Sequence, residues 1–464
     1  MKIPTGFLLA FILSVSPIFA APNYVVIFID DLGYGDIGPF GSTINDTPNL
    51  DRMAAEGMKL TTFYVAASVC TPSRAALMTG SYPRRVGLGR GSDHAVLFPG
   101  DAHALHPDEI TIAEMLKEKG YATGCFGKWH LGDQDGYLPT DQGFDTYFGI
   151  PYSNDMWPEH NSWPFPELPI LKGHEVVGKV PDMDAQAALC RQFTGAATDF
   201  IRKNKDQPFF VYLPHAFVHH PRAASPEFMA NAENETEAQI EEVDWSTGQI
   251  LDTIRELDLA ENTLVIFTSD NGGARGCSNA PLRGGKGTHW EGGFREPTLA
   301  WWPGTIPADS TCDEVITAMD LFPTFAKLSG GNVPTDRVID GKDISPLLLA
   351  EKGAKSPHDT FYYNQGNGLT SVRSGKWKLS KNGELYDLEA DIAESKDVSS
   401  ENPEVVKRIQ PLFQSFEVEL AENSRPVGKP KDPKTRLPRP GVSGDEAYAP
   451  TLTLQTRKKS GKKK

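Results

Sequence analysis

One cysteine in this sequence stands in a setting that favours chemistry. Cys70 is followed by Thr71, Pro72, Ser73 and Arg74, and the run continues to a Thr-Gly pair at Gly80. The segment from Ser73 onward is typical of a helix with proline in its first turn, so Cys70 is expected at the positive N-terminal end, where a developing oxyanion is stabilised. A bare Cys-x-Pro is more often an ordinary buried cysteine, and the longer run is what argues for a functional one.

Oxygen-bearing side chains follow two predicted strands. Asp30 and Asp31 come directly after the apolar run at 24–29, and Asp270 and Asn271 come directly after the run at 263–269. Oxygen ligands suit a hard cation such as Ca²⁺ or Mg²⁺ rather than zinc. Either pair alone is typical of a helix cap or a solvated turn. Because both pairs follow buried strands, together they indicate a metal site.

Positive and imidazole groups occur in short motifs further along the chain. Lys128 and His130 are two residues apart, a spacing that places both on one side of an extended segment. Three histidines lie between 215 and 220, and Lys286 lies in a glycine-rich run at 282–297. The formal net charge of −15 argues against nucleic acid as a partner. An anionic substrate therefore requires a local cluster of cations such as these.

The run from Cys70 to Gly80 resembles the modification signature of the formylglycine-dependent sulfatases, a family of the alkaline phosphatase superfamily. The resemblance implies that a formylglycine-generating or sulfatase-maturating enzyme converts Cys70 to formylglycine (3-oxoalanine). It also implies a divalent cation, Ca²⁺ in preference to Mg²⁺, with these ligands: Asp30, Asp31, Cys70, Asp270 and Asn271. The motifs occur in family order from the strand at 24 to the end of the predicted small sheet.

The same resemblance implies a role for each remaining motif residue. Arg74 helps to spread charge, Lys128 contacts the nucleophile's oxygens, and His130 is the acid/base partner of the formylglycine hydrate. The segment 149–153 resembles the arylsulfatase and N-acetylgalactosamine-6-sulfatase branch, in which the Ser153 position contacts sulfate. His219 and Lys286 are expected to bind sulfate and to protonate the leaving oxygen, although three histidines crowd the region around 219.

Alternating strands and helices position these motifs. Strands are predicted at 24–29, 209–213 and 263–269, and helices at 110–119 and 241–257. This order predicts an α/β fold with a large mixed sheet sandwiched by helices, whose ligand site lies beyond the carboxyl ends of the strands. Four short strands between 360 and 387 and a helix at 403–420 predict a smaller C-terminal antiparallel sheet packed by a helix.

The predicted organisation has four parts. Residues 1–20 have the layout of a secretory signal peptide, which predicts a secreted or periplasmic protein without a membrane span. A sulfatase catalytic domain is expected at 21–355, a small α+β subdomain at 356–425, and a disordered Pro- and Lys-rich tail at 426–464. The cysteines other than Cys70 are expected as two disulfides or as buried thiols.

The function predicted from this sequence is hydrolysis of sulfate monoesters, on sugars of a sulfated polysaccharide or glycosaminoglycan. Trp157, Trp163 and Trp290 are candidates for stacking on sugar rings, although aromatic residues are as often core. Two alternatives remain open at this stage. One is a phosphoester hydrolase of the same superfamily, and the other is a non-catalytic glycan-binding homologue in which Cys70 stays unmodified.

Overall fold

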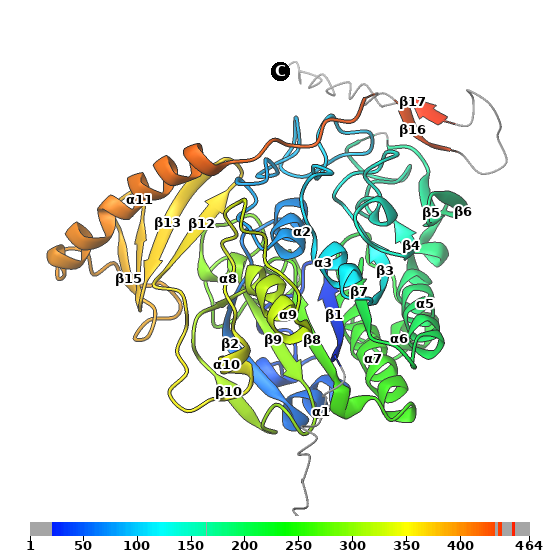
Figure 1. Cartoon of the computed structure of the whole chain (residues 1–464), viewed down its shortest axis with the longest axis horizontal. Helices are drawn as coiled ribbons and strands as arrows, with labels where there is room; N and C mark the ends of the chain where they lie inside the picture. Colours follow the sequence, from blue (N-terminus) through cyan, green and yellow to red (C-terminus); the bar gives the residue numbers. More distant parts are fainter. Residues whose placement is uncertain (1–20, 164, 432–434, 439–447, 451–464) are drawn as a thin grey trace, which may run out of the picture.

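The centre of the molecule is a mixed sheet, in a computed structural model that describes residues 21–163, 165–431, 435–438 and 448–450 (Figure 1). The strands of this sheet are β1 (Asn23–Ile29), β2 (Met58–Tyr64), β3 (Ala122–Lys128), β4 (Thr146–Ile150), β5 (Leu168–Lys172), β6 (Glu175–Val180), β7 (Phe209–Pro214), β8 (Thr263–Ser269), β9 (Arg295–Trp301), β10 (Ser310–Cys312) and β11 (Ile316–Thr317). They follow the order β10-β2-β9-β8-β1-β7-β3-β4-β5-β6, and β11 also pairs with β2. Strand β1 runs parallel to both β7 and β8, so the carboxyl ends of these three strands meet at one edge.

Strand β1 is buried on both faces. Its side chains alternate between the two faces. Tyr24, Val26 and Phe28 pack in one hydrophobic cluster, and Val25, Ile27 and Ile29 pack in the other. A strand covered on both sides reads as a continuous apolar run, which is why the sequence at 24–29 predicts it.

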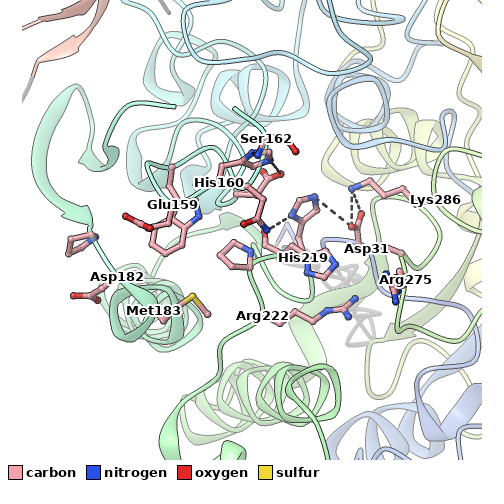
Figure 2. A pocket seen from close by; sticks show the side chains of 17 residues that line it. Asp31, Glu159, His160, Ser162, Asp182, Met183, His219, Arg222, Arg275 and Lys286 are labelled. Atoms are coloured by element: carbon pink, nitrogen blue, oxygen red, sulfur yellow. Dashed lines mark hydrogen bonds and ion pairs between the residues drawn. The ribbon is translucent and has the colours of Figure 1, made fainter. Parts of the chain in front are cut away.

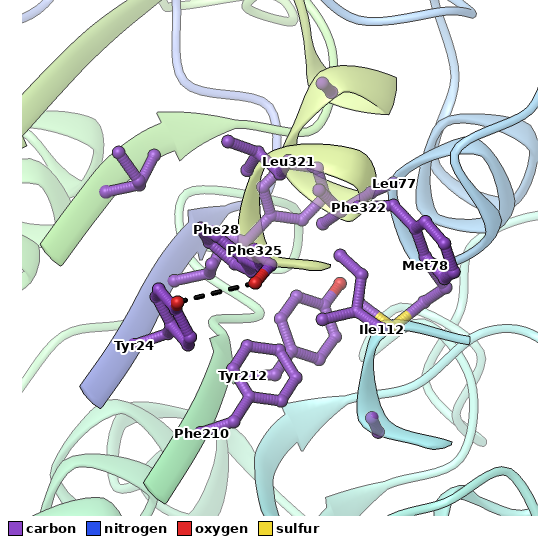
Figure 3. Packing of buried hydrophobic residues seen from close by; sticks show 14 of the residues in the cluster. Tyr24, Phe28, Leu77, Met78, Ile112, Phe210, Tyr212, Leu321, Phe322 and Phe325 are labelled. Carbon is purple, nitrogen blue, oxygen red and sulfur yellow. Dashed lines mark hydrogen bonds between the residues drawn. The ribbon is translucent and has the colours of Figure 1, made fainter. Parts of the chain in front are cut away.

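Helices cover both faces of the sheet. One face carries α2 (Cys70–Thr79), α3 (Ile112–Glu118), α9 (Leu321–Ser329) and α10 (Ser345–Leu348), and the other carries α1 (Pro48–Glu56), α5 (Leu189–Lys203) and α7 (Glu235–Glu256). The shorter helices are α4 (Met183–Ala187), α6 (Pro226–Met229) and α8 (Glu291–Phe294). Figure 3 shows the first face, where the ring of Phe325 from α9 stacks on Tyr24 with centroids 4.2 Å apart.

A second, four-stranded antiparallel sheet follows in the chain. Its strands β12 (Thr360–Gln365), β13 (Gly368–Ser374), β14 (Trp377–Ser380) and β15 (Leu385–Asp387) lie in chain order. Helix α11 (Pro403–Asn423) packs across this sheet, where Phe416 stacks on Tyr362 with centroids 4.1 Å apart (Figure 1). The predicted fold class is therefore confirmed, with a large mixed sheet between helices and a smaller sheet packed by one helix.

The predicted element bounds need small corrections. Helix α7 begins at Glu235 rather than near 241, because the side chain of Asn234 accepts the backbone N–H groups of Thr236 and Glu237 and caps the helix there. Helix α2 begins at Cys70 itself, with Pro72 in its first turn. All five cysteines are free thiols, so the alternative of two disulfides is wrong.

The structure describes only part of the two ends of the chain. The predicted signal peptide at 1–20 lies outside the described residues, as does most of the predicted tail. Within that tail, Gly428 pairs with Ala104, and β16 (Thr435–Pro438) pairs with β17 (Tyr448–Pro450). In the part of the chain that the structure describes, no helix combines the length and the apolar character that a membrane crossing needs.

Candidate active site

The two predicted oxygen clusters meet at the carboxyl edge of the central sheet. Ile29 and Ser269 pair in register at the ends of β1 and β8, so the residues that follow them emerge side by side. The amide of Asn271 donates to Asp31 Oδ1 at 2.8 Å, and the backbone N–H of Asp270 donates to Ile29 O at 2.8 Å. All four side chains, Asp30, Asp31, Asp270 and Asn271, are buried.

Cys70 lies at the first residue of α2, directly beside these carboxylates. Its Sγ is 3.5 Å from Asp30 Oδ1 and 3.7 Å from Lys286 Nζ. Burial raises the pKa of the Cys70 thiol to about 12, although Lys128 and Lys286 act in the opposite direction. An unmodified thiol at this position is therefore protonated and a weak nucleophile at neutral pH.

Three cations pair with the three carboxylates of this cluster, and Arg74 reaches two of them. Arg74 forms two hydrogen bonds to Asp270 Oδ2, at 2.7 and 3.0 Å, while Lys128 Nζ is 2.5 Å from Asp30 Oδ2 and Lys286 Nζ is 2.7 Å from Asp31 Oδ1. Burial by itself would raise the pKa of Asp30, but the surrounding cations, Lys128 foremost, hold it well below its usual range. The six groups carry no net formal charge, so a bound dication would make this cluster positive and suited to an anion.

Lys128 and His130 occupy different backbone conformations. Strand β3 ends at Lys128, whose Nζ donates to Ser153 Oγ at 3.0 Å. His130 has φ of 62°, so the expectation that both residues face one side of an extended segment is wrong. Trp129 between them is fully buried in the core, and the chain turns there to bring the His130 ring inward.

The His130 imidazole is held by one ring nitrogen. Its Nε2 lies 2.9 Å from Leu97 O, while Nδ1 is buried without a hydrogen-bond partner among the described residues. Burial, followed by the charge of Lys128, lowers the pKa of His130 well below its ordinary value. Because Leu97 O can only accept, Nε2 carries the proton and Nδ1 is left as a free base.

The three histidines around 219 have different environments. His219 Nε2 is 3.6 Å from Asp31 Oδ2, which places it at the carboxylate cluster. His215 is buried elsewhere and is hydrogen-bonded to Ser246 Oγ at 3.0 Å. His220 is exposed on the wall of the adjoining cavity. Of the three, His219 is the one that the structure brings to the predicted site.

The residues at the sheet edge fit a hard divalent cation. Ligand atoms of Asp30, Asp31, Cys70 and His219 all lie within 4.8 Å of one another. Asn271 Oδ1 is buried with no hydrogen-bond partner among the described residues, and a buried amide oxygen without a donor is costly unless something else satisfies it. A cation preferring oxygen ligands would satisfy it.

A cavity of about 1080 Å³ opens beside this cluster. Asp31, His219 and Lys286 lie at one end of it, and Figure 2 shows Glu159, Asp182 and Met183 on the opposite side. Residues 155, 157, 159–162 and 181–183 line it, so much of the chain that follows Ser153 borders the site. Its volume is that of a small-molecule pocket rather than of a sulfate ion alone.

The three tryptophans considered for stacking on sugar rings have different environments. Trp157 lines the cavity among the described residues. Trp163 packs edge-on against Phe98, with centroids 5.8 Å apart. The Arg283 guanidinium lies over the ring of Trp290, 3.5 Å from its centroid.

Several cavity residues carried no sequence signal. Arg222 and Arg275 line its wall but belong to no motif, and Asp155, two residues after Ser153, was not assigned a role. The pKa of Asp155 is lowered: burial raises it, but the charge of His219 and a hydrogen bond from Ser153 outweigh this. Proximity to a motif in sequence is the only signal that could have found Asp155 and Arg222.

The loop that carries Lys286 is braced by the C-terminal sheet. Lys378 of β14 donates to His289 O at 2.9 Å and lies 2.7 Å from Glu394 Oε1 and 3.2 Å from Glu291 Oε1. Glu394 in turn accepts the backbone N–H of Glu291 at 2.7 Å, and its carbonyl accepts a bond from Arg283 at 2.8 Å. Contacts on both sides of Lys286 thus fix the loop to the second sheet.

A buried cysteine at a helix N-terminus, carboxylates suited to a cation, and a set of cations around them are groups that suit a hydrolase of anionic esters. Residues 22–331 match the family described as Sulfatase, and residues 285–420 match the one described as N-sulphoglucosamine sulphohydrolase, C-terminal. The chain belongs to the sulfatase family, whose members hydrolyse sulfate esters.

Named relatives agree with this assignment. Arylsulfatase A of Homo sapiens is 40% identical over 383 residues, covering 77% of this chain and 74% of that protein. N-acetylgalactosamine-6-sulfatase of Canis lupus familiaris is 39% identical over 397 residues, covering 81% and 75%. The solved structure of Ps i-CgsB, also determined in complex with k-i-k-neocarrahexaose, has a TM-score of 0.78 at 31% identity, covering 88% of this chain and 95% of that one.

Proposed function

We propose that this sulfatase removes sulfate from sugars of a sulfated polysaccharide or glycosaminoglycan. The observation that carries the proposal is the cavity, which extends the carboxylate and cation cluster into a space large enough for a saccharide. The relative that acts as an N-acetylgalactosamine-6-sulfatase and the neocarrahexaose complex of Ps i-CgsB support a saccharide substrate. Aryl sulfates would then serve as convenient assay substrates.

The reaction would use Cys70 in its formylglycine form, installed by a formylglycine-generating or sulfatase-maturating enzyme. The hydrated aldehyde supplies one hydroxyl to attack sulfur and a second hydroxyl to expel sulfate afterwards. The site would hold Ca²⁺ in preference to Mg²⁺ through the sheet-edge residues Asp30, Asp31, Asp270 and Asn271 together with position 70. Bound there, the cation supplies positive charge to the anionic oxygens.

The side chains of this chain would perform three tasks. Arg74, Lys128 and Lys286 would stabilise charge on the sulfate oxygens, and Ser153 would hydrogen-bond the sulfate. Protonation of the departing oxygen falls to His219 or Lys286, both of which line the cavity.

His130 would act as the base of the second half of the reaction. Its unprotonated Nδ1 is buried without a hydrogen-bond partner in the part of the chain that the structure describes, so it is available to accept a proton from the hydroxyl that expels sulfate. Its low pKa keeps it neutral and ready as a base across the neutral range. The backbone carbonyl of His130 accepts from Thr71 at 3.1 Å, which ties this histidine to the first turn of α2.

The deciding experiment is mass spectrometry of the peptide that contains Cys70, combined with assays on matched aryl sulfate and aryl phosphate. We expect formylglycine at position 70 and faster release of sulfate than of phosphate. Cys70→Ser and Cys70→Ala proteins should fold and bind metal but not turn over. Turnover by either variant at the wild-type rate would refute the proposed mechanism. An unmodified Cys70 would favour the alternative of a non-catalytic glycan-binding homologue.

Export is part of the same proposal. The N-terminal segment 1–20 has the layout of a signal peptide, and sulfated polysaccharides lie outside the cell membrane. We expect the mature protein in a periplasm or the medium, cleaved near Ala20. N-terminal sequencing of the protein recovered from those fractions tests this.

A further inference from the structure

Two arginines on the cavity wall form no ion pair with any carboxylate of the described residues. Arg222 and Arg275 both line the cavity, and among the described residues neither forms an ion pair with a carboxylate. The hydrogen bonds of Arg222 within the described part of the chain go to neutral acceptors, Val218 O at 3.3 Å and Cys277 Sγ at 3.6 Å. Burial raises the pKa of Asp36, and the charge of Arg222 acts in the opposite direction. Guanidinium groups without a carboxylate in direct contact, on the wall of a pocket, are suited to bind a planar or tetrahedral anion.

Both arginines come from segments that are fixed to the reaction centre. Val218 N–H donates to Asp30 O at 2.7 Å, which anchors the stretch that carries His219 and Arg222 to the end of β1. Arg275 lies on the loop after Asn271, next to Gly276. The backbone of Gly276 is so close to Arg222 that a Cβ atom added to this glycine would lie 2.4 Å from Arg222 Nη1. The segments that carry the two arginines are therefore neighbours, and the segment of Arg222 is hydrogen-bonded to the end of β1.

Most cations of the cavity lie at one end, beside Asp31, whose carboxylate pairs with Lys286. Figure 2 shows Arg222 and Arg275 on the same side as His219 and Lys286, whereas Glu159 and Asp182 lie on the other side. Glu159 and Asp182 are both exposed, so their carboxylates face solvent and the cavity. An anionic substituent is attracted to the first end and repelled from the second.

We propose that Arg222 and Arg275 form a second anion-binding subsite beside the scissile sulfate, so that the preferred substrate carries another anionic group close to the ester that is cleaved. This inference rests on the proposed function. The group is a second sulfate ester or the carboxylate of an adjoining uronic acid, since both present paired oxygens to a guanidinium. The sugar on the side of Glu159 and Asp182 is uncharged.

The test compares three saccharides with an aryl sulfate: a monosulfated hexosamine, its disulfated counterpart, and a monosulfated disaccharide with a uronic acid. The wild-type enzyme should show kcat/KM about 10- to 100-fold higher for at least one dianionic saccharide than for the monosulfated one, the range of one or two charge-assisted hydrogen bonds. Which dianion is favoured separates the sulfate source from the carboxylate source. Equal kcat/KM for all three saccharides would overturn the subsite.

Variants locate the effect. Arg222→Gln and Arg275→Gln should each lower kcat/KM by about 10-fold on the favoured dianion, through KM, and leave aryl sulfate turnover unchanged. Glu159→Gln, on the opposite wall, is the matched control and should not lower it. Equal losses on the aryl sulfate would mean that the arginines act only structurally, against the proposal. Arg275 is exposed, so its replacement leaves the fold intact.

A binding measurement separates this inference from the proposed function. Calorimetric titration of the Cys70→Ala protein with the monosulfated and dianionic saccharides requires no turnover. Tighter binding of a dianion that is lost in the Arg275→Gln background supports the subsite. Failure of the wild-type enzyme to release sulfate would count against the proposed reaction but not against this subsite. Equal binding of all the saccharides refutes the subsite while leaving sulfatase activity on aryl sulfate unaffected.

Discussion

Lys378 is the residue whose removal should most clearly separate positioning from chemistry. It is almost fully buried, it lies between the carboxylates of Glu291 and Glu394, and it holds the loop of Lys286 through His289 O. Lys378→Met leaves two buried carboxylates without their shared cation, and breaking a buried ion pair in this way costs about 3–5 kcal/mol of the free energy of unfolding. In urea this corresponds to a fall of the unfolding midpoint on the order of 1 M.

The matched control is the same substitution two residues earlier. Lys376 pairs with Asp387 at 2.5 Å, but its side chain is 38% exposed, so Lys376→Met should lower the free energy of unfolding much less than Lys378→Met. Urea unfolding followed by circular dichroism gives both values. Aryl sulfate turnover, measured well below the unfolding transition, should fall by about 10- to 100-fold in Lys378→Met alone, because Lys286 loses its support.

Two results would refute this reasoning. Equal unfolding midpoints for the two variants would mean that the buried network does not stabilise the second sheet. A large loss of stability with unchanged turnover would show that the loop of Lys286 keeps its position without Lys378.

Two further predictions concern pH and metal. Lys378 and Arg373 overcome the opposing effect of burial and lower the pKa of Glu291 to about 2. A lowered pKa stabilises the folded protein at pH values above the ordinary pKa of 4.5, and this stabilisation is lost as the pH falls toward 2. Urea midpoints measured across that range should fall less steeply for Glu291→Gln than for wild type, and parallel curves would contradict this. Asn271→Leu should weaken Ca²⁺ binding to chelator-treated protein by at least about 10-fold in calorimetry, whereas Asn262→Leu, at the other end of β8, should not. Equal affinities of the two variants would remove Asn271 from the site.

Much of the site could be predicted because its signals are local in sequence. The strand at 263–269 has the same bounds in the structure, and the acidic residues after it and after β1 were expected at one edge because parallel strands end together. The helix start at Cys70 follows from a proline in the first turn. The dense motif at 70–80 also singled out Cys70 and Arg74 without any knowledge of their neighbours.

Contacts between distant segments were beyond the reach of those signals. Nothing in the sequence shows that Asn271 Oδ1 lacks a donor, or that a left-handed residue at His130 turns its ring inward, because both depend on packing around the sheet edge. The choice of His219 over its neighbours depends on which imidazole reaches Asp31.

The sequence by itself determined the family, the fold class with three strands of the central sheet, and the residue types of the candidate site, since these depend on local periodicity and motif spacing. Only the tertiary structure decided which charges meet. Arg222 and Arg275 are 53 positions apart by their residue numbers, and they line one cavity because the segments after β7 and β8 end at the same edge of the sheet. The support of Lys286 by Lys378 likewise exists only because the second sheet packs against the loop before α8.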